Sequence, residues 1–338
     1  MTFLKAAAFA GLAIALVAPG RTQDRNDGKI PLPPVATFSI VAFDPATQEW
    51  GVTVASRYFS VGSVVPWAEA GVGAIATQAN VNVGYGPQGL ALLREGLTAK
   101  QVLDKLMAED AFDGKDGRQV AIIDGKGNIA AFTGPAANKW AGDTQGKTWS
   151  AQGNILVGPQ VVEEMGKAFE ATNGDLAEKL FAALKAGDAA GGDSRGRQSA
   201  SMLVVKKGGG RNLNNDRLIY LNVDDNPAPI PELRRLLDMN QMILYQDRSF
   251  KLFNSGKYKE AREAAIGMAR YAPAGPQIHT TLGVYAYFAG DKPAALEEFR
   301  KAKAAQPDFR TRFEAMLKNR TAWKAILDDA EFLNKLWE

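Results

Sequence analysis

The stretch TFSIVAFDPATQEWGVTVAS, residues 37–56, places two runs rich in β-branched and aromatic residues on either side of a polar segment that carries Pro45. Such runs favour strands, and a short polar turn between them predicts a β-hairpin. The hairpin opens with a hydroxyl residue, Thr37, directly after the proline-rich spacer PLPPVA. This position raises the question of whether Thr37 is more than the first residue of a strand.

Beyond the hairpin, the sequence predicts alternating groups of strands and helices. Gly96 separates two helical runs, and Thr98 is expected to cap the start of the second. The run DGKGN, residues 124–128, suits the tight reversal of a second hairpin. This order of elements fits a layered α+β sandwich better than a parallel doubly wound sheet. The remaining expected elements are a buried strand at 71–80, helices at 159–171 and 175–186, and two strands that lead to residue 226.

The composition excludes several kinds of chemistry. With 40 Lys and Arg against 37 Asp and Glu, the net charge is +3, which argues against nucleic-acid binding as the main function. The chain has no cysteine and one histidine, His279. Thiolate catalysis, disulfides, histidine-based zinc sites and a Ser-His-Asp triad within the first 250 residues are therefore excluded, and we expect no cofactor and no metal. A hydrolase of this composition would need a carboxylate, a lysine or an α-amine as its base.

The N-terminal 36 residues have the composition of export and linker segments. Lys5 precedes an apolar run, residues 6–18, that is too short for a stable membrane helix. We interpret residues 1–20 as a signal peptide, which implies a periplasmic or secreted protein with no stable membrane span once the signal is removed. An uncleaved anchor is the alternative. Residues 21–36 are polar and then proline-rich, as in a linker or pro-segment.

The C-terminal part of the chain is expected to be helical. Residues 227–244 predict a connecting helix. Residues 245–338 predict a tetratricopeptide-like helical domain, because three pairs of residues recur at an offset of 34. The concave face of such an array usually binds a peptide or protein, so a protein partner is expected there, although ordinary helical hairpins are the alternative. The three pairs are Gly256 with Gly290, Ala261 with Ala295, and Pro273 with Pro307.

Thr37 fits one chemistry that needs neither histidine nor cysteine. In an N-terminal-nucleophile hydrolase, the hydroxyl of the first residue attacks a carbonyl carbon, and the α-amine of the same residue takes the proton. This mechanism requires the peptide bond between Ala36 and Thr37 to be broken. The alternative is an ordinary strand residue, since threonine is common in strands.

Four longer motifs resemble a family known as domain of unknown function 1028, from residue 37 to about residue 240. The resemblance implies a four-layer αββα sandwich of the N-terminal-nucleophile-hydrolase type over residues 37–226, followed by the all-α tetratricopeptide-like domain. It implies no settled substrate. The motifs are ATFSIVAFDPATQEWGVTVASRYFSVGSVVPWAEAGVGAIATQANVNVGYGPQGLALL, WAGDTQGKTWSAQGNILVGPQV, AGGDSRGRQSASMLVV and VDDNPAPIPELRRLLD.

The sequence departs from this family in what precedes Thr37. In cytoplasmic relatives, the equivalent threonine often follows the initiator methionine directly. Here it follows the signal and a segment of 16 residues, 21–36. Exposure of its amine would therefore need self-cleavage or trimming by a protease.

Amide side chains are candidates for the groups that support Thr37. An oxyanion hole needs donors near the developing charge, and the run ATQANVN offers Gln78 and Asn80. These two alternate on one expected strand, so we expect them to point the same way. The run SAQGN offers a further amide, Asn154, which we assign to substrate binding. Satisfying backbone groups at a strand end is the alternative role for all three.

Charged residues near the same region are candidates for substrate binding. Arg57 follows an expected buried strand, where a cation could lower the pKa of the α-amine or bind a substrate carboxylate. The glycine-rich loop GGDSRGRQS contains Asp193, Arg197 and Gln198, which combine backbone freedom with polar groups suited to a pocket rim. A strand-end ion pair and a solvated turn are the alternatives.

Together these features favour an exported amidohydrolase that cleaves C–N amide bonds in an unknown small amide or peptide. The main alternative is a non-catalytic αββα envelope protein that acts through its helical repeats.

Overall fold

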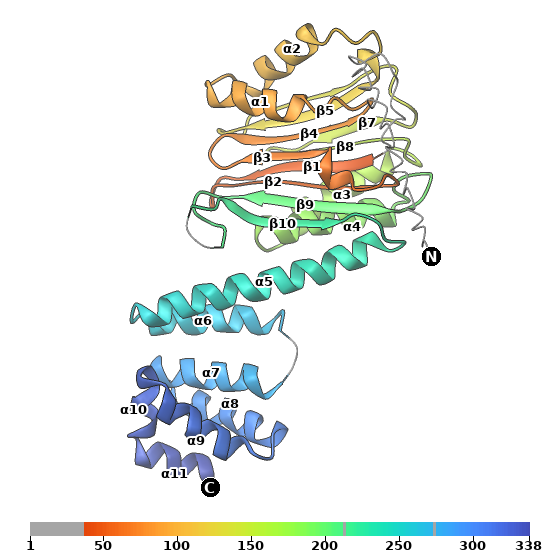
Figure 1. Cartoon of the computed structure of the whole chain (residues 1–338). Helices are drawn as coiled ribbons and strands as arrows, with labels where there is room; N and C mark the ends of the chain where they lie inside the picture. The colour runs from red at the N-terminus through yellow and green to blue at the C-terminus, as the bar shows by residue number, and fades with distance from the viewer. Residues whose placement is uncertain (1–36, 212–213, 273–274) are drawn as a thin grey trace, which may run out of the picture.

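The computed structural model describes residues 37–211, 214–272 and 275–338 (Figure 1). The expected signal peptide, the expected linker or pro-segment and Pro273 of the internal repeat lie outside the described residues. Strands and their helices occupy the first part of the described chain, and helices alone follow.

Six strands form one antiparallel sheet in the order β10-β9-β2-β1-β8-β7. The predicted hairpin of residues 37–56 is confirmed, because β1 pairs along its whole length with β2. β1 lies inside the sheet, between β2 and β8. The strands are β1 (Thr37–Asp44), β2 (Glu49–Ser56), β7 (Gly142–Gln145), β8 (Trp149–Asn154), β9 (Ser199–Val205) and β10 (Arg217–Val223).

Four strands form a second antiparallel sheet in the order β3-β4-β5-β6. The predicted reversal at residues 124–128 is confirmed, because the Asp124 carboxylate accepts hydrogen bonds from the amides of Lys126 and Asn128 at 2.9 and 3.0 Å. The strands are β3 (Pro66–Glu69), β4 (Gly73–Ala79), β5 (Arg118–Asp124) and β6 (Ile129–Thr133).

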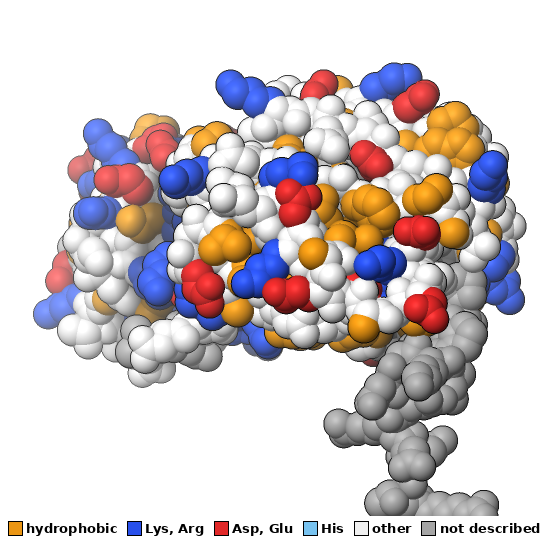
Figure 2. All heavy atoms as spheres, turned by 90° about the horizontal axis from the view of Figure 1, so that it is seen from above, with side chains coloured by type: hydrophobic (Ala, Val, Ile, Leu, Met, Phe, Trp, Pro, Cys, Tyr) orange, Lys and Arg blue, Asp and Glu red, His pale blue; other side chains and the backbone are white. Residues whose placement is uncertain are grey.

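The two sheets lie face to face, with helices on both outer sides (Figure 1). Helices α1 (Tyr85–Arg94) and α2 (Ala99–Glu109) cover the four-stranded sheet, while α3 (Gln160–Ala171) and α4 (Leu176–Ala189) cover the six-stranded sheet. Thr98 caps α2 as expected, in a capping box with Gln101. On the side of α1 and α2, acidic and basic side chains are interspersed (Figure 2).

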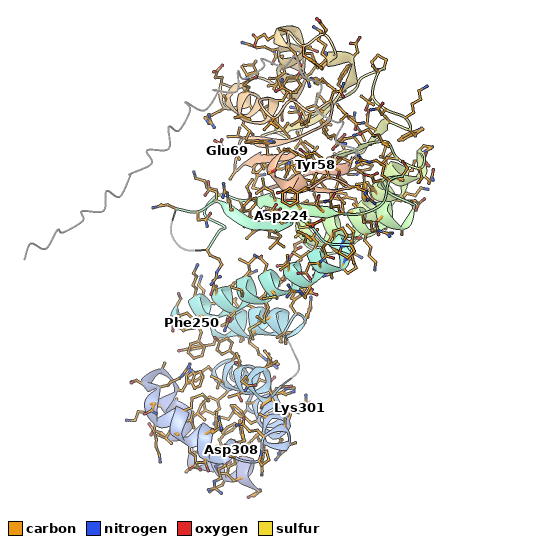
Figure 3. All side chains as sticks on the ribbon, turned by 45° about the vertical axis from the view of Figure 1, so that its right-hand side comes forward. Tyr58, Glu69, Asp224, Phe250, Lys301 and Asp308 are labelled. Atoms are coloured by element: carbon orange, nitrogen blue, oxygen red, sulfur yellow. The ribbon has the colours of Figure 1, made fainter. Side chains whose placement is uncertain are left out.

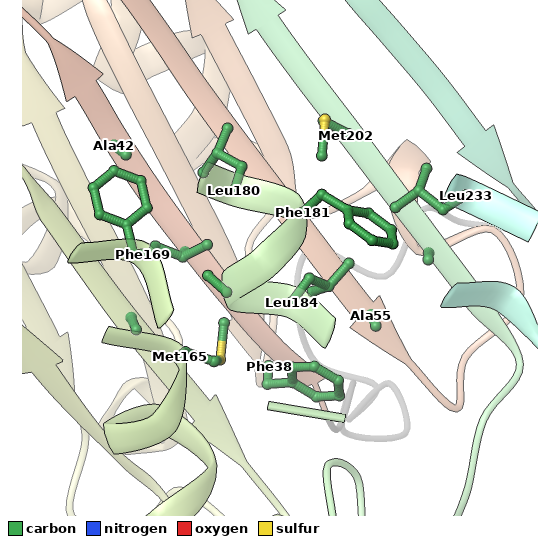
Figure 4. Packing of buried hydrophobic residues seen from close by; sticks show 14 of the residues in the cluster. Phe38, Ala42, Ala55, Met165, Phe169, Leu180, Phe181, Leu184, Met202 and Leu233 are labelled. Atoms are coloured by element: carbon green, nitrogen blue, oxygen red, sulfur yellow. The ribbon is translucent and has the colours of Figure 1, made fainter. Parts of the chain in front are cut away.

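Alternation along β1 decides which side chains meet the helices and which lie between the sheets. Phe38, Ile40 and Ala42 pack against α3 and α4, in a cluster that also contains Leu180 and Leu184 (Figure 4). Val41 and Phe43 pack instead between the two sheets. Since Thr37 and Ser39 share the parity of Val41, their side chains also lie between the sheets.

The run GYGPQG, residues 84–89, has the GxGxxG spacing of a dinucleotide-binding loop. It leads from β4 into α1, but both neighbours of β4 are antiparallel, so the parallel βαβ unit of such a site is missing here. A Cβ added to Gly86 would lie 2.1 Å from Trp67 Cδ2, and one added to Gly89 would lie 2.5 Å from Ile75 Cδ1. These glycines therefore allow close packing of α1 on its sheet.

Helix α5 (Pro229–Asn254) joins the sandwich to the C-terminal helices. Its first half contributes Leu233 and Leu237 to the cluster around α4, and its second half contributes Phe253 to the C-terminal cluster. The helix therefore runs past residue 244, where the connecting helix was expected to end. We call the second half of α5 and the elements after it the helical array; its helices are α6 (Tyr258–Ala269), α7 (Pro276–Phe288), α8 (Lys292–Ala305), α9 (Phe309–Asn319), α10 (Lys324–Leu327) and α11 (Ala330–Trp337).

Two of the residue pairs at the 34-residue offset occupy matching places in the helical array. Gly256 and Gly290 follow the ends of α5 and α7 with φ angles of 72° and 86°. Such angles favour glycine, which ends a helix without strain. Ala261 and Ala295 are fully buried within the following helices, α6 and α8. Within the described ranges, no helix combines the length and apolar character needed to span a membrane.

Candidate active site

The layer between the two sheets is apolar at one end and polar at the other. The apolar end contains Val41, Phe43, Trp50, Val52, Val54, Ala74, Ala76, Ala121, Ile123, Leu203 and Val205. The polar end lies where β1 begins and is built by residues of the same parity on β1, β2, β4 and β5, together with residues of β8. It consists of Thr37, Ser39, Ser56, Gln78, Gln119, Gln152 and Asn154, each at most 2% exposed.

Thr37 lies at the centre of this polar end in the six-stranded sheet. It is the first residue of β1 and pairs with Ser56 on β2 and with Asn154 on β8. Side chains directly opposite one another on neighbouring strands lie on the same face. The Thr37 hydroxyl donates to Ser56 Oγ at 3.3 Å, and the residue is fully buried. The threonine singled out in the sequence is therefore inside the sandwich, among polar groups from three adjacent strands.

A chain of amide and hydroxyl groups connects the two sheets beside Thr37. Gln152 Nε2 donates to Ser39 Oγ at 2.6 Å, and Ser39 Oγ donates to Gln78 Oε1 at 2.6 Å. Gln78 Nε2 donates to Gln119 Oε1 at 2.8 Å. The remaining contacts of Gln78 Nε2, to Thr37 O and Gln152 O, are both 3.5 Å long and therefore weak. One N–H of Gln78 can thus turn to a stronger acceptor without breaking a short bond.

Asn154 contains an unsatisfied acceptor. Its Nδ2 donates to Gln119 Oε1 at 3.1 Å, but no described residue donates to its buried Oδ1. The orientation of Gln119 is set by Nε2, which donates to Gly153 O at 2.8 Å and to Thr133 Oγ1 at 3.0 Å. Because Gln119 presents an oxygen to Asn154, Asn154 must present its nitrogen in return. A buried acceptor left in this way costs about 1–3 kcal/mol.

Asn80 does not lie with Gln78, so the expectation that the two side chains point the same way is wrong. β4 ends at Ala79, whose φ of 64° breaks the alternation of the strand. Asn80 Nδ2 instead donates to Gly114 O at 3.4 Å. The guanidinium of Arg118 donates to the Asn80 carbonyl. Asn80 therefore holds the loop before β5, on the outer side of the four-stranded sheet.

The charged candidates gather in two loops just beyond Ser56. The amide of Arg57 donates to Asp193 Oδ2 at 2.8 Å, and the Arg57 guanidinium donates to Arg195 O at 3.0 Å. Arg195 forms an ion pair with Asp193 at 3.0 Å. Since the Asp193 side chain is only 1% exposed, it acts as the buried anchor of this loop cluster. The structure thus brings Arg57 and Asp193 together, in a group separate from the amides of the polar end.

A cavity of about 80 Å³ lies between these loops and the helices. Arg197 contributes to its wall and donates to Asp188 Oδ1 at 2.6 Å; this bond raises the pKa of the Arg197 guanidinium. Gln198 instead donates to Asp225 Oδ1 at 3.1 Å. Ser56 belongs both to the cavity wall and to the polar end. The lining residues are Phe38, Ala55, Ser56, Asp188, Gly191, Asp193, Gly196, Arg197, Ser199, Pro229 and Ile230.

Several members of the polar end were missed in the sequence. Ser39 and Gln152 lie two positions from Thr37 and Asn154 on the same strands, and Gln119 is the register partner of Gln78. A polar residue two positions from a candidate, in an otherwise apolar strand, is the signal that would have identified Ser39 and Gln152. His279 lies in the helical array, where Nδ1 is 2.7 Å from Glu298 Oε2. Within the described ranges, no group of three or more histidine, aspartate or glutamate side chains could hold a metal ion.

Comparisons with known proteins relate the sandwich-forming part of the chain to one family. A model of a family described as "Family of unknown function (DUF1028)" matches residues 37–233. The crystal structure of protein SPO2555 from Silicibacter pomeroyi, described by the same family, is similar with a TM-score of 0.55 and 32% sequence identity, covering 60% of this chain and 85% of that chain. No curated protein matches the sequence significantly. The chain therefore belongs to DUF1028, a family of unknown function.

Proposed function

We propose that this protein is an exported N-terminal-nucleophile amidohydrolase in which Thr37 is the nucleophile. The observation that carries the proposal is the place of Thr37: it is the first residue of an inner strand, fully buried at the polar end between two sheets. A hydroxyl held there among amide donors and acceptors suits attack on a carbonyl group. The αββα arrangement of the helices and sheets is the one that the N-terminal-nucleophile-hydrolase type requires.

The reaction would be hydrolysis of a C–N amide bond in two steps. In the first, Thr37 Oγ1 attacks the carbonyl carbon while the hydroxyl proton passes to the N-terminal amine. The C–N bond then breaks, the proton moves to the leaving nitrogen, and an ester on Thr37 remains. In the second step, water attacks the ester carbon and gives a proton to the amine. The C–O bond breaks, the proton returns to Oγ1, and a carboxylic acid is released.

The surrounding residues supply supporting roles. Gln78 is the candidate oxyanion donor, because one N–H makes only weak contacts at 3.5 Å, one of them to Thr37 O. The loop cluster and cavity beyond Ser56, with Arg57, Asp193 and Arg197, are the candidate binding site for a small amide or peptide. Gln198 donates to Asp225 Oδ1 at the neighbouring strand end, and in this proposal it is a polar group at the rim of the binding site. Asn80, which contacts the loop before β5, has no role in this proposal.

Export and processing belong to the same proposal. Residues 1–20 would direct the chain to the periplasm or out of the cell, and signal removal alone would leave Thr37 internal. Cleavage between Ala36 and Thr37, by the protein itself or by another protease, would create the amine that the mechanism needs.

The helical array would be tetratricopeptide-like and bind a protein partner. A groove of about 590 Å³ crosses it, and Phe250, which is 59% exposed, reaches this groove from the second half of α5 (Figure 3). An exposed aromatic side chain such as Phe250, beside arginines, is typical of protein-binding surfaces. This groove also favours the second candidate function, a non-catalytic protein that acts through the array. Its aromatic and cationic lining residues are Phe250, Tyr285, Phe309, Phe313, Trp323, Arg312 and Arg320.

The start of the mature chain tests the proposal. The protein would be purified from its native source, and its intact mass and N-terminal sequence determined. We expect a chain that begins at Thr37. A uniform start near residue 21 would overturn the mechanism and leave the binding function as the better account.

A further inference from the structure

We infer that Asn154 is a positioning residue, whose Oδ1 accepts a hydrogen bond from the α-amino group of a chain that begins at Thr37. This inference rests on the proposed function and deepens it, because it assigns the group that holds the general base. Asn154 does not touch the reacting carbonyl in this role. It would act on the reaction through the amine.

The first support is the accounting of donors at the polar end. Ser39, Gln78 and Gln152 each donate a hydrogen bond to a neighbouring oxygen. Gln119 likewise donates to Gly153 O and Thr133 Oγ1. Asn154 Oδ1 is the acceptor of this network that no described residue satisfies, and Asn154 is fully buried. What the network lacks is therefore one donor beside Asn154.

The second support is the position of Asn154 in the sheet. It is the register partner of Thr37 across β1 and β8. Directly opposite residues of antiparallel strands have Cβ atoms about 4.5–5.5 Å apart, which is within reach of an asparagine side chain. An internal Thr37 has a single peptide N–H, whereas a chain start carries two or three N–H donors on the same nitrogen. Cleavage before Thr37 would thus create new donors next to the acceptor of the polar end that no described residue satisfies.

The third support is the chemistry that an amide offers to a base. A neutral acceptor orients the amine and compensates in part for its burial, which by itself would lower the amine pKa. A carboxylate at this position would hold the amine in its protonated form, unable to take the hydroxyl proton. The charged groups that border the layer are Asp143, which accepts from Thr133, and Arg57 with Asp193 beyond Ser56. None of these forms a described bond with Asn154.

The experiment measures the pKa of the Thr37 amine directly. A chain of residues 37–338 would be released from an N-terminal fusion by a protease that leaves no extra residue. This chain keeps every described sheet and every hydrophobic cluster. With ¹⁵N-labelled threonine, the amine resonance would be titrated by NMR in the wild type, Asn154→Asp, Asn154→Ala and the exposed control Asn138→Asp.

We expect Asn154→Asp to raise the amine pKa by about 1 unit or more, since an opposite charge close by favours the protonated form. Asn154→Ala should lower the amine pKa, because the protonated form loses an acceptor. If Asn154→Asp does not fold, the alanine variant decides the question alone. An amine pKa that changes no more in the Asn154 variants than in Asn138→Asp would overturn the inference.

Failure of this inference and failure of the proposed function are distinguishable. The titration uses a chain whose start is made at Thr37 by design, so its outcome does not depend on processing in the native source. A native start near residue 21 would overturn the proposed function, even if Asn154 shifts the amine pKa. A native start at Thr37 with unresponsive Asn154 variants would overturn only the inference.

Discussion

The two ends of the layer between the sheets share strands β1, β2, β4 and β5 but differ in what they bury. Along β1, Val41 and Phe43 pack in the apolar end. Thr37 and Ser39, which precede them on the same face of the strand, lie in the hydrogen-bonded polar end. Burial of an aliphatic or aromatic side chain contributes about 1.5–3 kcal/mol, whereas a buried hydrogen bond contributes about 0.5–1.5 kcal/mol net. Stability therefore comes mainly from the apolar end, and the polar end holds hydroxyl and amide groups in position at lower gain.

A second polar cluster shows what a purely structural arrangement looks like. Asp110 and Arg118 form a buried ion pair at 2.9 Å that ties α2 to β5. Tyr85 and the amide of Phe112 also donate to the Asp110 carboxylate. This carboxylate is fully engaged, whereas Asn154 at the polar end keeps an unsatisfied acceptor. The difference separates a buried carboxylate whose hydrogen bonds are complete from a polar cluster that keeps one buried acceptor unsatisfied.

The largest expected effect on stability is at the structural cluster. Arg118→Met should lower the free energy of unfolding by about 3–5 kcal/mol, because it leaves the Asp110 carboxylate buried without its cation. Urea denaturation of purified protein measures this. The control is Arg94→Met, which breaks an exposed pair with Glu69 and should cost at most about 1 kcal/mol. Equal losses in the two variants would show that burial of the pair has no consequence.

Truncation in the apolar end should come next. Ile123→Ala removes a fully buried side chain between the sheets and should lower the free energy of unfolding by about 2–5 kcal/mol. Ile129→Ala, at a half-buried position packed against the same cluster, should cost less. The same denaturation experiment compares them. An Ile123→Ala loss below that of Ile129→Ala would contradict the place of Ile123 in the fully buried core of the apolar end.

Within the polar end, the loss in the free energy of unfolding should follow the number of hydrogen-bonding groups that each substitution leaves unsatisfied. Ser39→Ala strands Gln78 Oε1 and Gln152 Nε2, so we expect a loss of about 1–3 kcal/mol in the free energy of unfolding. Asn154→Ala removes an acceptor that has no described donor, and should cost less than about 1 kcal/mol. A larger loss of stability for Asn154→Ala than for Ser39→Ala would mean that Asn154 has a structural role.

The pH dependence of stability provides the smallest effect. Burial alone would raise the pKa of Asp110, but hydrogen bonds from Arg118, Tyr85 and the Phe112 amide outweigh it and lower that pKa. The unfolded chain therefore takes up the Asp110 proton first, and the stabilisation is present above the unfolded pKa of about 3.9. It is lost as the pH falls through the lower folded value.

Unfolding in urea at a series of pH values below about 5 tests this sign. Asp110→Asn should flatten the acid-side decline relative to the wild type. Asp104→Asn, which alters an exposed pair with Lys100, should leave the decline unchanged. A wild-type decline that Asp110→Asn does not alter would contradict the lowered pKa of Asp110.

Local patterns predicted the elements that carry strong local signals. The hairpin of β1 and β2 and the Thr98 cap were identified because β-branched alternation and capping residues act within a few positions. β3 and β7 were not predicted, because each has four residues and one begins with Pro66. Their pairing with β4 and β8 provides the stability that their own sequences lack.

At the candidate site, the sequence pointed to Thr37 and Gln78 but not to their surroundings. Gln119 joins them only through pairing of β5 with β4 and stacking of the two sheets, neither of which a local pattern encodes. The prediction for Asn80 was wrong because the positive φ of Ala79 ends the side-chain alternation of β4 one residue before Asn80. Long-range register and single backbone angles were the information that the sequence patterns did not contain.

Mass-spectrometric mapping of a covalent adduct tests the central claim most directly. Mature protein would be treated with a hydroxyl-reactive electrophile, digested, and searched for modified peptides, beside Thr37→Ala and the control Thr53→Ala. Thr53 is a buried threonine on β2 that donates to Ser201 O at 2.8 Å. The account predicts an adduct on Thr37 that persists in Thr53→Ala and disappears in Thr37→Ala. An adduct that persists in Thr37→Ala, or mature protein that starts at Thr37 and takes up no label, would contradict it.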